Sequence, residues 1–151
     1  MSGIVVVDQR SDWPVDTPGV EVVTAWDYLT RDEFTRGRRT RIYNLCRSFA
    51  YQSTGYYVSL LAGARDHRPL PDITTVQDLK LREGPRVLND EVETLLQQSL
   101  APLESDRYVL HAYFGRCPSK RHERLARALF NLFPSPLLMA RMVRRDGEWR
   151  V

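Results

Sequence analysis

Two arginines stand where an α/β protein can bind an anion. Arg47 and Ser48 directly follow a β-like segment and precede a helix-like one, and Tyr51 and Gln52 lie in the same junction. In open α/β sheets, ligands bind outside the carboxyl ends of the strands, and a helix N-terminus favours negative charge. The planar fork of arginine binds carboxylate or phosphate through two hydrogen bonds. The junction therefore predicts a binding site for an acidic group.

Arg116 repeats this arrangement later in the chain. It follows the strand-like residues 107–114 and precedes another helix-like segment. One hypothesis is that Arg47 and Arg116 converge on a single acidic ligand. The alternative is that each arginine pairs with a local carboxylate, such as that of Asp8, or with carbonyl groups of its own loop. Tyr51 has two interpretations as well, because it can line a cleft or pack against the adjoining loop.

Several other kinds of site lack their sequence signatures. No G-x-G-x-x-G follows the first strand-like run, and neither G-x-x-x-x-G-K-[ST] nor H-E-x-x-H occurs in the chain. The three histidines, His67, His111 and His122, are not at metal-ligand spacing from each other or from the cysteines. We therefore expect no dinucleotide fingerprint, no P-loop and no metal site.

The two cysteines, Cys46 and Cys117, are too few for a disulfide framework, and we interpret both as reduced thiols. One functional hypothesis, weaker than the two given at the end of this section, is a cysteine-dependent enzyme that uses Cys46. It needs a partner that activates the thiolate, and the sequence points to none. A cysteine at the end of a strand is more often a small packed hydrophobic residue.

Composition and charge describe an ordinary globular chain. It has 151 residues, of which 42% are hydrophobic and 27% charged, and its formal net charge is +3. The start of the chain lacks the basic region of a secretory leader, and the apolar run around residues 56–64 is shorter than the roughly 18 residues of a membrane span. These features predict a cytoplasmic protein with no membrane partner.

The basic residues are almost all arginine, because only Lys80 and Lys120 are lysines among the 22. Base composition of the gene or a need for bidentate binding would each explain this bias. Two clusters are notable, RGRRTR at residues 36–41 and the face of a later helix that carries Lys120, Arg121, Arg124 and Arg127. Aromatic residues are not interleaved with them, so we expect a solvated or partner-facing surface and not a nucleic-acid site.

The elements that must position these residues follow from periodicity and turn chemistry. Strands are predicted at residues 4–7, 19–25, 42–46, 107–114, 137–143 and 149–151. Helices are predicted at 26–34, after a cap at Ser53 or Thr54, at 75–81, after a cap at Asn89, and from Pro118 and Ser119. In the second of these helices, the spacing of Tyr57, Leu60, Leu61 and Ala64 predicts the face that packs on the core.

Strands that alternate with helices indicate an α/β fold. We predict a three-layer domain with a largely parallel sheet and a C-terminal antiparallel hairpin, whose turn lies at Asp146 and Gly147. No repeat, low-complexity segment or shift in composition marks a second domain, so residues 1–151 are predicted to form a single one.

Four stretches resemble a known family. They are VVVDQRSDWPVDTPGVEVV, NLCRSFAYQSTGYYVSLLAGARDHRPLP, and the pair YFGR and ALFNLFPSPLL. They are similar to the N-terminal domain of RimK-like ATP-grasp proteins, and the resemblance extends over essentially the whole chain. In that family the domain precedes an ATP-grasp ligase domain, which activates a carboxylate with ATP and joins it to an amine.

The resemblance implies an accessory, substrate-side domain of a carboxylate-amine ligase that does not catalyse alone. It implies no cofactor in this chain, since ATP and Mg²⁺ belong to the ligase domain, and a domain boundary near Val151. The implied partners are a C-terminal or separate ATP-grasp domain and a peptide or amino-acid substrate. No family residue role is carried over to this chain, so the prediction for Arg47, Ser48, Tyr51, Gln52 and Arg116 rests on their positions at strand ends alone. An alternative function is a free-standing interaction module that uses its arginine surface to hold a protein or nucleic-acid partner.

Overall fold

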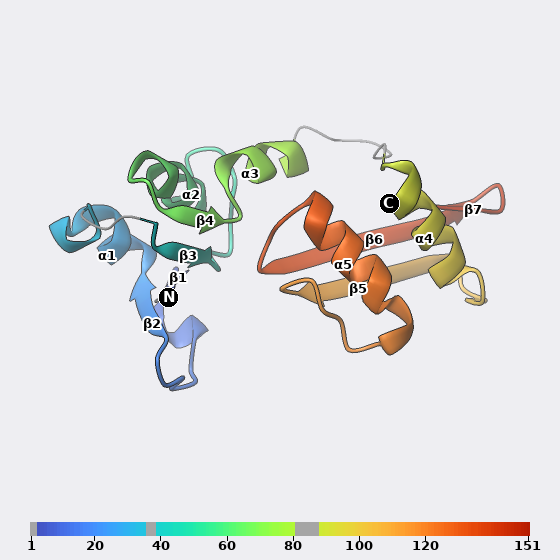
Figure 1. Ribbon diagram of the computed structural model, residues 1–151, viewed down its shortest axis with the longest axis horizontal. Helices are drawn as coiled ribbons and strands as arrows, with labels where there is room; N and C mark the ends of the chain where they lie inside the picture. The colour runs from blue at the N-terminus through green and yellow to red at the C-terminus, as the bar shows by residue number, and fades with distance from the viewer. Residues whose placement is uncertain (1–2, 36–38, 81–87) are drawn as a thin grey trace. The chain divides into compact units, whose positions relative to one another are not determined.

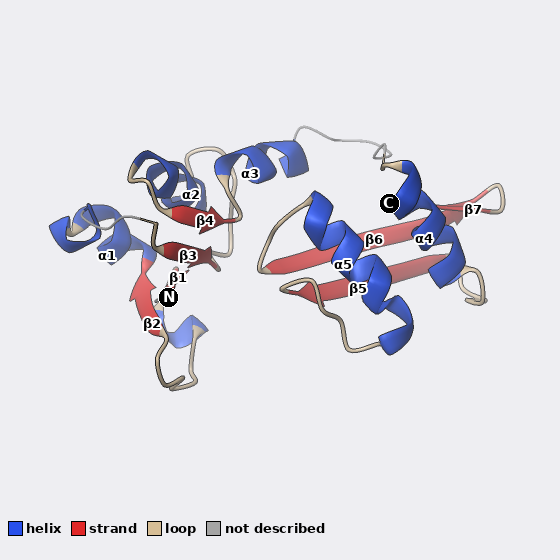
Figure 2. Ribbon diagram, viewed as in Figure 1, coloured by secondary structure: helices blue, strands red, loops and turns tan. Residues whose placement is uncertain are grey.

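The computed structural model describes residues 3–35, 39–80 and 88–151. These residues form two compact units, residues 1–77 and residues 78–151, and each unit has its own sheet (Figure 1). The first sheet is parallel and the second antiparallel, with helices beside both (Figure 2). This arrangement confirms the predicted α/β class, its parallel sheet and its C-terminal antiparallel hairpin. That residues 1–151 make one domain stays a prediction.

The first unit contains a four-stranded parallel sheet in the order β2-β1-β3-β4. Its strands are β1 (Gly3–Val7), β2 (Glu21–Thr24), β3 (Arg41–Asn44) and β4 (Arg68–Leu70). Its helices are α1 (Ala25–Thr30), α2 (Thr54–Ala64) and α3 (Ile73–Lys80), and the last of these contains the boundary between the units. Ile4 to Val7 are buried, as the continuous β-branched run predicts for a strand inside a parallel sheet.

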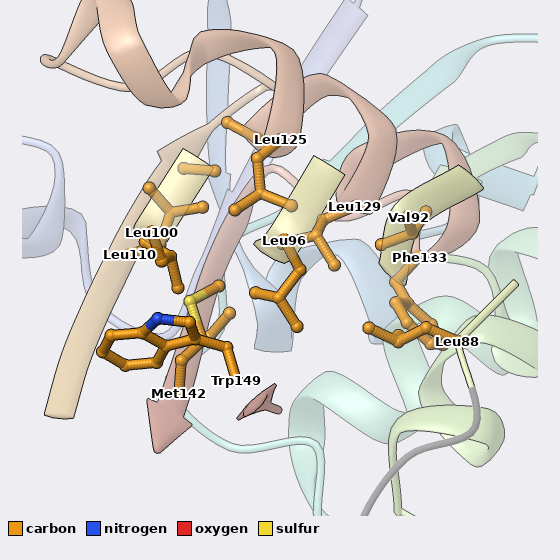
Figure 3. Close-up of a cluster of buried hydrophobic side chains, with 13 residues drawn as sticks. Leu88, Val92, Leu96, Leu100, Leu110, Leu125, Leu129, Phe133, Met142 and Trp149 are labelled. Carbon is orange, nitrogen blue, oxygen red and sulfur yellow. The ribbon is translucent and has the colours of Figure 1, made fainter. Parts of the chain in front are cut away.

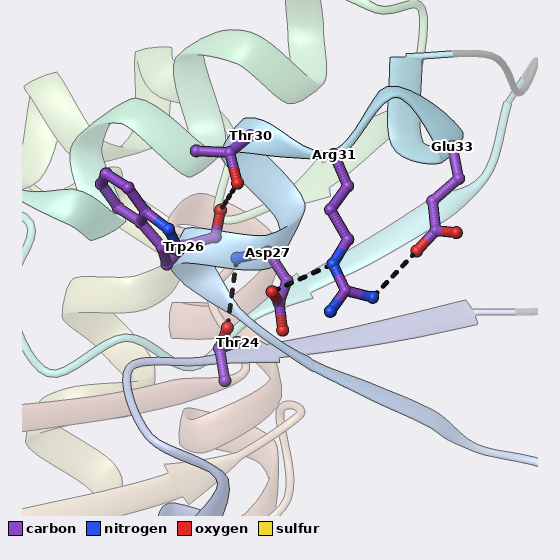
Figure 4. Close-up of polar contacts among 6 residues, drawn as sticks. All are labelled: Thr24, Trp26, Asp27, Thr30, Arg31 and Glu33. Carbon is purple, nitrogen blue, oxygen red and sulfur yellow. Dashed lines mark hydrogen bonds and ion pairs between the residues drawn. The ribbon is translucent and has the colours of Figure 1, made fainter.

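The helix predicted at residues 26–34 is shorter than expected. Thr24 caps α1 by accepting a hydrogen bond from the Asp27 N–H at 3.1 Å, and Arg31 pairs with Asp27 at 3.1 Å (Figure 4). At Arg31 the backbone becomes extended, and a 3₁₀ turn follows at Asp32–Thr35. The segment is therefore two short elements and not one helix.

The face of α2 that packs on the core differs from the predicted one. Gly55, Val58, Ser59 and Ala62 are buried, whereas Tyr57 and Leu60 are each 38% exposed. None of the 11 residues of α2 is charged, so the apolar spacing fits more than one face. The face with the small side chains is buried because those side chains let α2 lie close to the sheet.

The second unit contains a three-stranded antiparallel sheet in the order β5-β6-β7. Its elements are α4 (Asp90–Leu100), β5 (Arg107–Tyr113), a 3₁₀ turn (Lys120–His122), α5 (Glu123–Leu132), β6 (Leu137–Arg145) and β7 (Glu148–Arg150). The strand predicted at 107–114 therefore pairs with the hairpin and not with the parallel sheet. The last helix begins at Glu123, later than predicted, because the preceding turn is 3₁₀.

The turn between β6 and β7 and the start of α4 lie where the local sequence predicts them. Asp146 and Gly147 have φ values of 53° and 82°, as a tight hairpin turn requires. Asn89 caps α4 by accepting from the Val92 N–H at 2.9 Å. Gln97 then joins α4 to β7, because its side chain donates to the Trp149 carbonyl and accepts from the Trp149 N–H.

The core of the second unit lies between the helices and one face of its sheet (Figure 3). Val92, Leu96 and Leu100 of α4 contribute to it, as predicted, and so do Leu125 and Leu129 of α5. Leu95 and Leu132, which were predicted on the same stripes, pack at its margin. The other face of the sheet carries none of these side chains.

Two variants of α2 test which of its faces is structural. We expect Val58→Ala to lower the free energy of unfolding by about 2 kcal/mol, because it removes buried methyl groups. The matched Leu60→Ala variant removes an exposed side chain, and we expect a change within about 0.5 kcal/mol. Urea unfolding of both variants measures the difference, and a larger loss for Leu60→Ala would contradict the observed face.

Candidate functional site

A buried asparagine organises the junction between β3 and α2. Asn44 is 2% exposed at the end of β3, and its amide nitrogen donates to the Gly55 carbonyl at 2.8 Å and to Ser59 Oγ at 3.0 Å. Its amide oxygen accepts from the Cys46 N–H at 3.2 Å. Ser59 Oγ in turn donates to the Pro71 carbonyl at 2.7 Å. The network fixes where the chain leaves the sheet, and the sequence patterns did not single out Asn44.

The first turn of α2 lies directly against the junction. A Cβ at Gly55 would come within 2.4 Å of the Ser48 carbonyl oxygen, so no larger residue fits there without a shift of the backbone. Ser53 is the N-cap, as predicted: its Oγ accepts from the Tyr56 N–H at 3.3 Å and donates to the Ser48 carbonyl at 2.8 Å. Residues 46–53 are therefore held against the N-terminus of α2.

Arg47 is held by two carboxylates from the segment that follows β1. Its backbone N–H donates to Asp8 Oδ2 at 2.7 Å, and its guanidinium pairs with Asp12 Oδ1. The Arg47 side chain is nonetheless 66% exposed. Pairing with local carboxylates, the alternative that the sequence left open, thus describes Arg47. The Asp12 side chain is only 15% exposed, so the pair is partly buried, and a ligand carboxylate can reach the guanidinium from its solvent-exposed side.

Ser48, Tyr51 and Gln52 lie around Arg47 in sequence but differ in environment. Ser48 Oγ accepts from the Ala50 N–H at 3.2 Å, so it supports the local turn. Tyr51 is 73% exposed, and its ring lies edge-on to that of Tyr56 with centroids 5.4 Å apart. Gln52 is exposed and has a φ of 64°, which is uncommon for a residue with a side chain. These residues form an exposed rim and not an enclosed pocket.

Arg116 lies in a tight turn of the second unit. Tyr113 and Arg116 exchange backbone hydrogen bonds of 2.7 and 3.0 Å, and Phe114 and Gly115 between them have φ values of 51° and 76°. The Arg116 side chain is exposed. Arg47 follows a strand of the parallel sheet, whereas Arg116 follows a strand of the antiparallel sheet. Convergence of the two arginines on one ligand stays a prediction.

The cysteine thiols are protonated at neutral pH. Burial, followed by the negative charge of Asp8, raises the pKa of the Cys46 thiol to about 12. Burial also raises the pKa of Cys117, whose Sγ donates to the Ser119 carbonyl at 3.1 Å. A nucleophilic cysteine requires a thiolate, so the environment of Cys46 disfavours the cysteine-dependent enzyme.

Two of the histidines make hydrogen bonds within their own units. His67 Nδ1 and the Tyr28 hydroxyl are 2.7 Å apart, and His122 Nδ1 and Ser99 Oγ are 2.6 Å apart. Burial, with a smaller effect of the Arg121 charge, lowers the pKa of His122. Residues 3–35, 39–80 and 88–151 contain no group of three histidine, cysteine, aspartate or glutamate side chains that could hold a metal ion.

The cationic surfaces predicted from sequence are partly described. Arg39 and Arg41 are exposed, while Arg36, Gly37 and Arg38 of the RGRRTR cluster lie outside the described residues. On the last helix and the turn before it, Lys120, Arg121, Arg124 and Arg127 are exposed, and Arg127 pairs with Glu123 at 3.5 Å. The alternative function as an interaction module stays a hypothesis.

Comparison with family models shows which family the chain belongs to. A model described as RimK-like ATPgrasp N-terminal domain matches residues 25–151. This chain belongs to that family. Of the stretches that carry the resemblance, residues 5–23 lie outside the match and the other three lie within it. Comparisons with curated proteins and with solved structures find no match.

The match to the RimK-like N-terminal domain family includes the whole second unit and the part of the first unit from residue 25 onward. The matched range begins at α1 and continues through β7, so it contains Arg47 and Arg116. Among the described helices, none has the length and apolar character needed to cross a bilayer.

The Asn44 network predicts that loss of the Asn44 side-chain amide strongly destabilises the protein. We expect Asn44→Ala to lower the free energy of unfolding by about 3 kcal/mol, because it leaves the buried Cys46 N–H and Ser59 hydroxyl without the amide. Asn131→Ala, at an exposed position of α5, is the matched control and should change it by about 0.5 kcal/mol or less. Thermal or urea unfolding measures both. Equal effects would contradict a structural role of the network.

The Cys46 environment predicts slow alkylation. In a Cys117→Ser variant, Cys46 is the single thiol, and we expect iodoacetamide at pH 8 to modify it at least about 100-fold more slowly in the native protein than in urea. The physical reason is the combination of burial with a thiolate fraction that is very small at this pH. Intact mass against time measures the rates. Fast labelling of the native protein would show that Cys46 is accessible and reactive.

Proposed function

We propose that this chain is the accessory, substrate-side domain of an ATP-dependent carboxylate-amine ligase. The observation that carries the proposal is the family match over residues 25–151. The ligase reaction joins a carboxylate to an amine after activation by ATP. ATP and Mg²⁺ belong to an ATP-grasp domain, which is either another part of the same polypeptide or a separate partner.

Within this proposal, the chain contributes binding and not catalysis. The exposed guanidinium of Arg47, held in place at its backbone by Asp8, is a cationic group at the carboxyl end of a parallel strand. A substrate carboxylate would bind the solvent-exposed side of this guanidinium. Ser48, Tyr51 and Gln52 would contact the rest of a peptide or amino-acid substrate. Arg116, in the second unit, is a separate candidate for binding an acidic group.

The test uses the complete ligase, with ADP release measured in the presence of a glutamate-containing peptide. We expect Arg47→Ala and Arg116→Ala each to raise KM about tenfold with little change in kcat, because each removes a charge-assisted contact to the bound substrate. Arg31→Ala is the matched control, since it removes an exposed, carboxylate-paired arginine of α1's C-terminus, and it should leave KM unchanged.

Two results would contradict different parts of the proposal. Unchanged kinetics in both arginine variants would show that these residues do not bind substrate. If the complete protein releases no ADP in response to any carboxylate and amine pair, the assignment as part of a ligase is itself wrong.

A further inference from the structure

The sheet of the second unit has one face that its helices leave exposed. α4 and α5 pack on the face that carries Leu110 and Met142, where they form the core (Figure 3). Side chains alternate along a strand, so the odd-numbered positions of β5 and β6 point to the other face. These positions are exposed or half-buried, and so are Glu148 and Arg150 on β7, which share that face. We call it the outer face.

Four arginines surround one valine on the outer face. Val143 pairs with Arg107 of β5 on one side and with Arg150 of β7 on the other. Arg141 and Arg145 stand two positions before and after Val143 on β6. Cβ atoms of directly opposite residues lie about 5 Å apart and those of diagonal neighbours about 7–8 Å, so the four side chains begin within a small area. We call the four arginines the arginine cluster.

Negative charge neutralises only part of the arginine cluster. Among the described positions of the outer face, Glu148 is the one acidic residue, and it pairs with Arg150 at 3.8 Å. Asp106, next to β5, pairs instead with Arg144 at 3.8 Å. Across the described part of the chain, no carboxylate forms an ion pair with the other three arginines of the cluster. Like charges on neighbouring strands destabilise a sheet, so a bound anion would relieve a repulsion that the fold itself does not.

The charge of the arginine cluster also limits what can cover it. A second domain that packed an apolar surface onto these arginines would bury charges without partners, which costs more free energy than the apolar contact supplies. The cluster therefore faces solvent or an anion. Arginine binds phosphate well, because its planar fork forms two hydrogen bonds with the phosphate oxygens.

The rest of the outer face is aromatic and apolar. Tyr113 pairs with Leu137 and His111 with Met139, toward the other end of β5 and β6. The side chains of Tyr113, Leu137 and Met139 are 51%, 54% and 51% exposed. Bases of a single strand stack on exposed rings, and every base has a face that can stack. An acidic protein segment would use the arginines alone, so the exposed rings favour a nucleic acid.

We propose that the outer face binds single-stranded nucleic acid. The arginine cluster holds the phosphates, and Tyr113 and His111 stack on bases of the same strand. Phosphate contacts and stacking do not read sequence, so the preference for particular bases is weak. The surface belongs to the second unit, and the proposal does not depend on Arg47 or on the ligase function. Strand pairing, and no run of basic residues in the sequence, brings these arginines together.

The first experiment measures binding of a fluorescein-labelled oligothymidylate of about twelve nucleotides to the 151-residue chain, by anisotropy at several salt concentrations. Each neutralised phosphate of a single strand contributes about −0.7 to the slope of log K against log salt, so we expect a slope of about −2 to −3. Arg107→Gln and Arg141→Gln should each make the slope shallower by about 0.7 and weaken binding at least about fivefold. Arg124→Gln removes the same charge from α5 and, as the matched control, should change neither quantity.

A second set of measurements tests the stacking contacts. Tyr113→Ala should weaken binding at least about fivefold and leave the salt slope unchanged, because it removes a ring and no charge. Tyr113→Phe keeps the ring, so its affinity should stay within about twofold. An abasic strand of the same length has the phosphates without the bases, and we expect it to bind at least about fivefold more weakly with the same slope. The abasic strand leaves the protein unchanged, so the test stays decisive if Tyr113→Ala does not fold.

Four results would overturn the proposal. No binding by the folded chain at about 50 mM salt would show that the outer face is not a nucleic-acid site. Equal losses for Arg124→Gln and Arg141→Gln would mean that general positive charge, and not the arginine cluster, attracts the strand. Equal affinity of the abasic and intact strands would exclude stacking. Stronger competition by polyglutamate than by unlabelled oligothymidylate would identify an acidic protein segment as the occupant.

Discussion

The first unit depends on the requirement that a buried amide have all its hydrogen bonds satisfied. Asn44 meets it by joining the end of β3 to α2 and, through Ser59, to the Pro71 carbonyl. An unsatisfied amide inside the protein would cost about 1–3 kcal/mol, so the positions of these segments are coupled. The exit of the chain from the sheet, and hence the position of Arg47, follows from that coupling.

The charged groups at the carboxyl edge of the parallel sheet are brought together by the same exit of the chain after β3. Asp8 and Asp12 follow β1 and meet Arg47 after β3, because parallel strands end at the same edge. The same carboxylate of Asp8 adds to the burial that keeps Cys46 protonated. One edge thus combines an exposed guanidinium, paired with Asp12, with a protonated thiol, which fits binding of an anion better than nucleophilic chemistry.

The second unit is built on one antiparallel sheet of three strands. The Asp146 and Gly147 turn fixes the register of β6 and β7, and β7 pairs with only a third of β6. Helices α4 and α5 cover one face of the sheet with aliphatic side chains. The outward face of the sheet carries Arg107, Arg141, Arg145 and Arg150 beside apolar side chains such as that of Met139.

The sequence by itself determined the elements whose signals are local: the buried run of β1, the Ser53 and Asn89 caps, the stripe of α4 and the Asp-Gly hairpin. It also predicted that Arg47 stands at a strand end. Tertiary structure decided what depends on residues distant in sequence. Periodicity could not choose the buried face of the uncharged α2, the partner strand of β5, or Asp12 as the carboxylate that pairs with the Arg47 guanidinium, because packing of small side chains and strand pairing select among locally equivalent options.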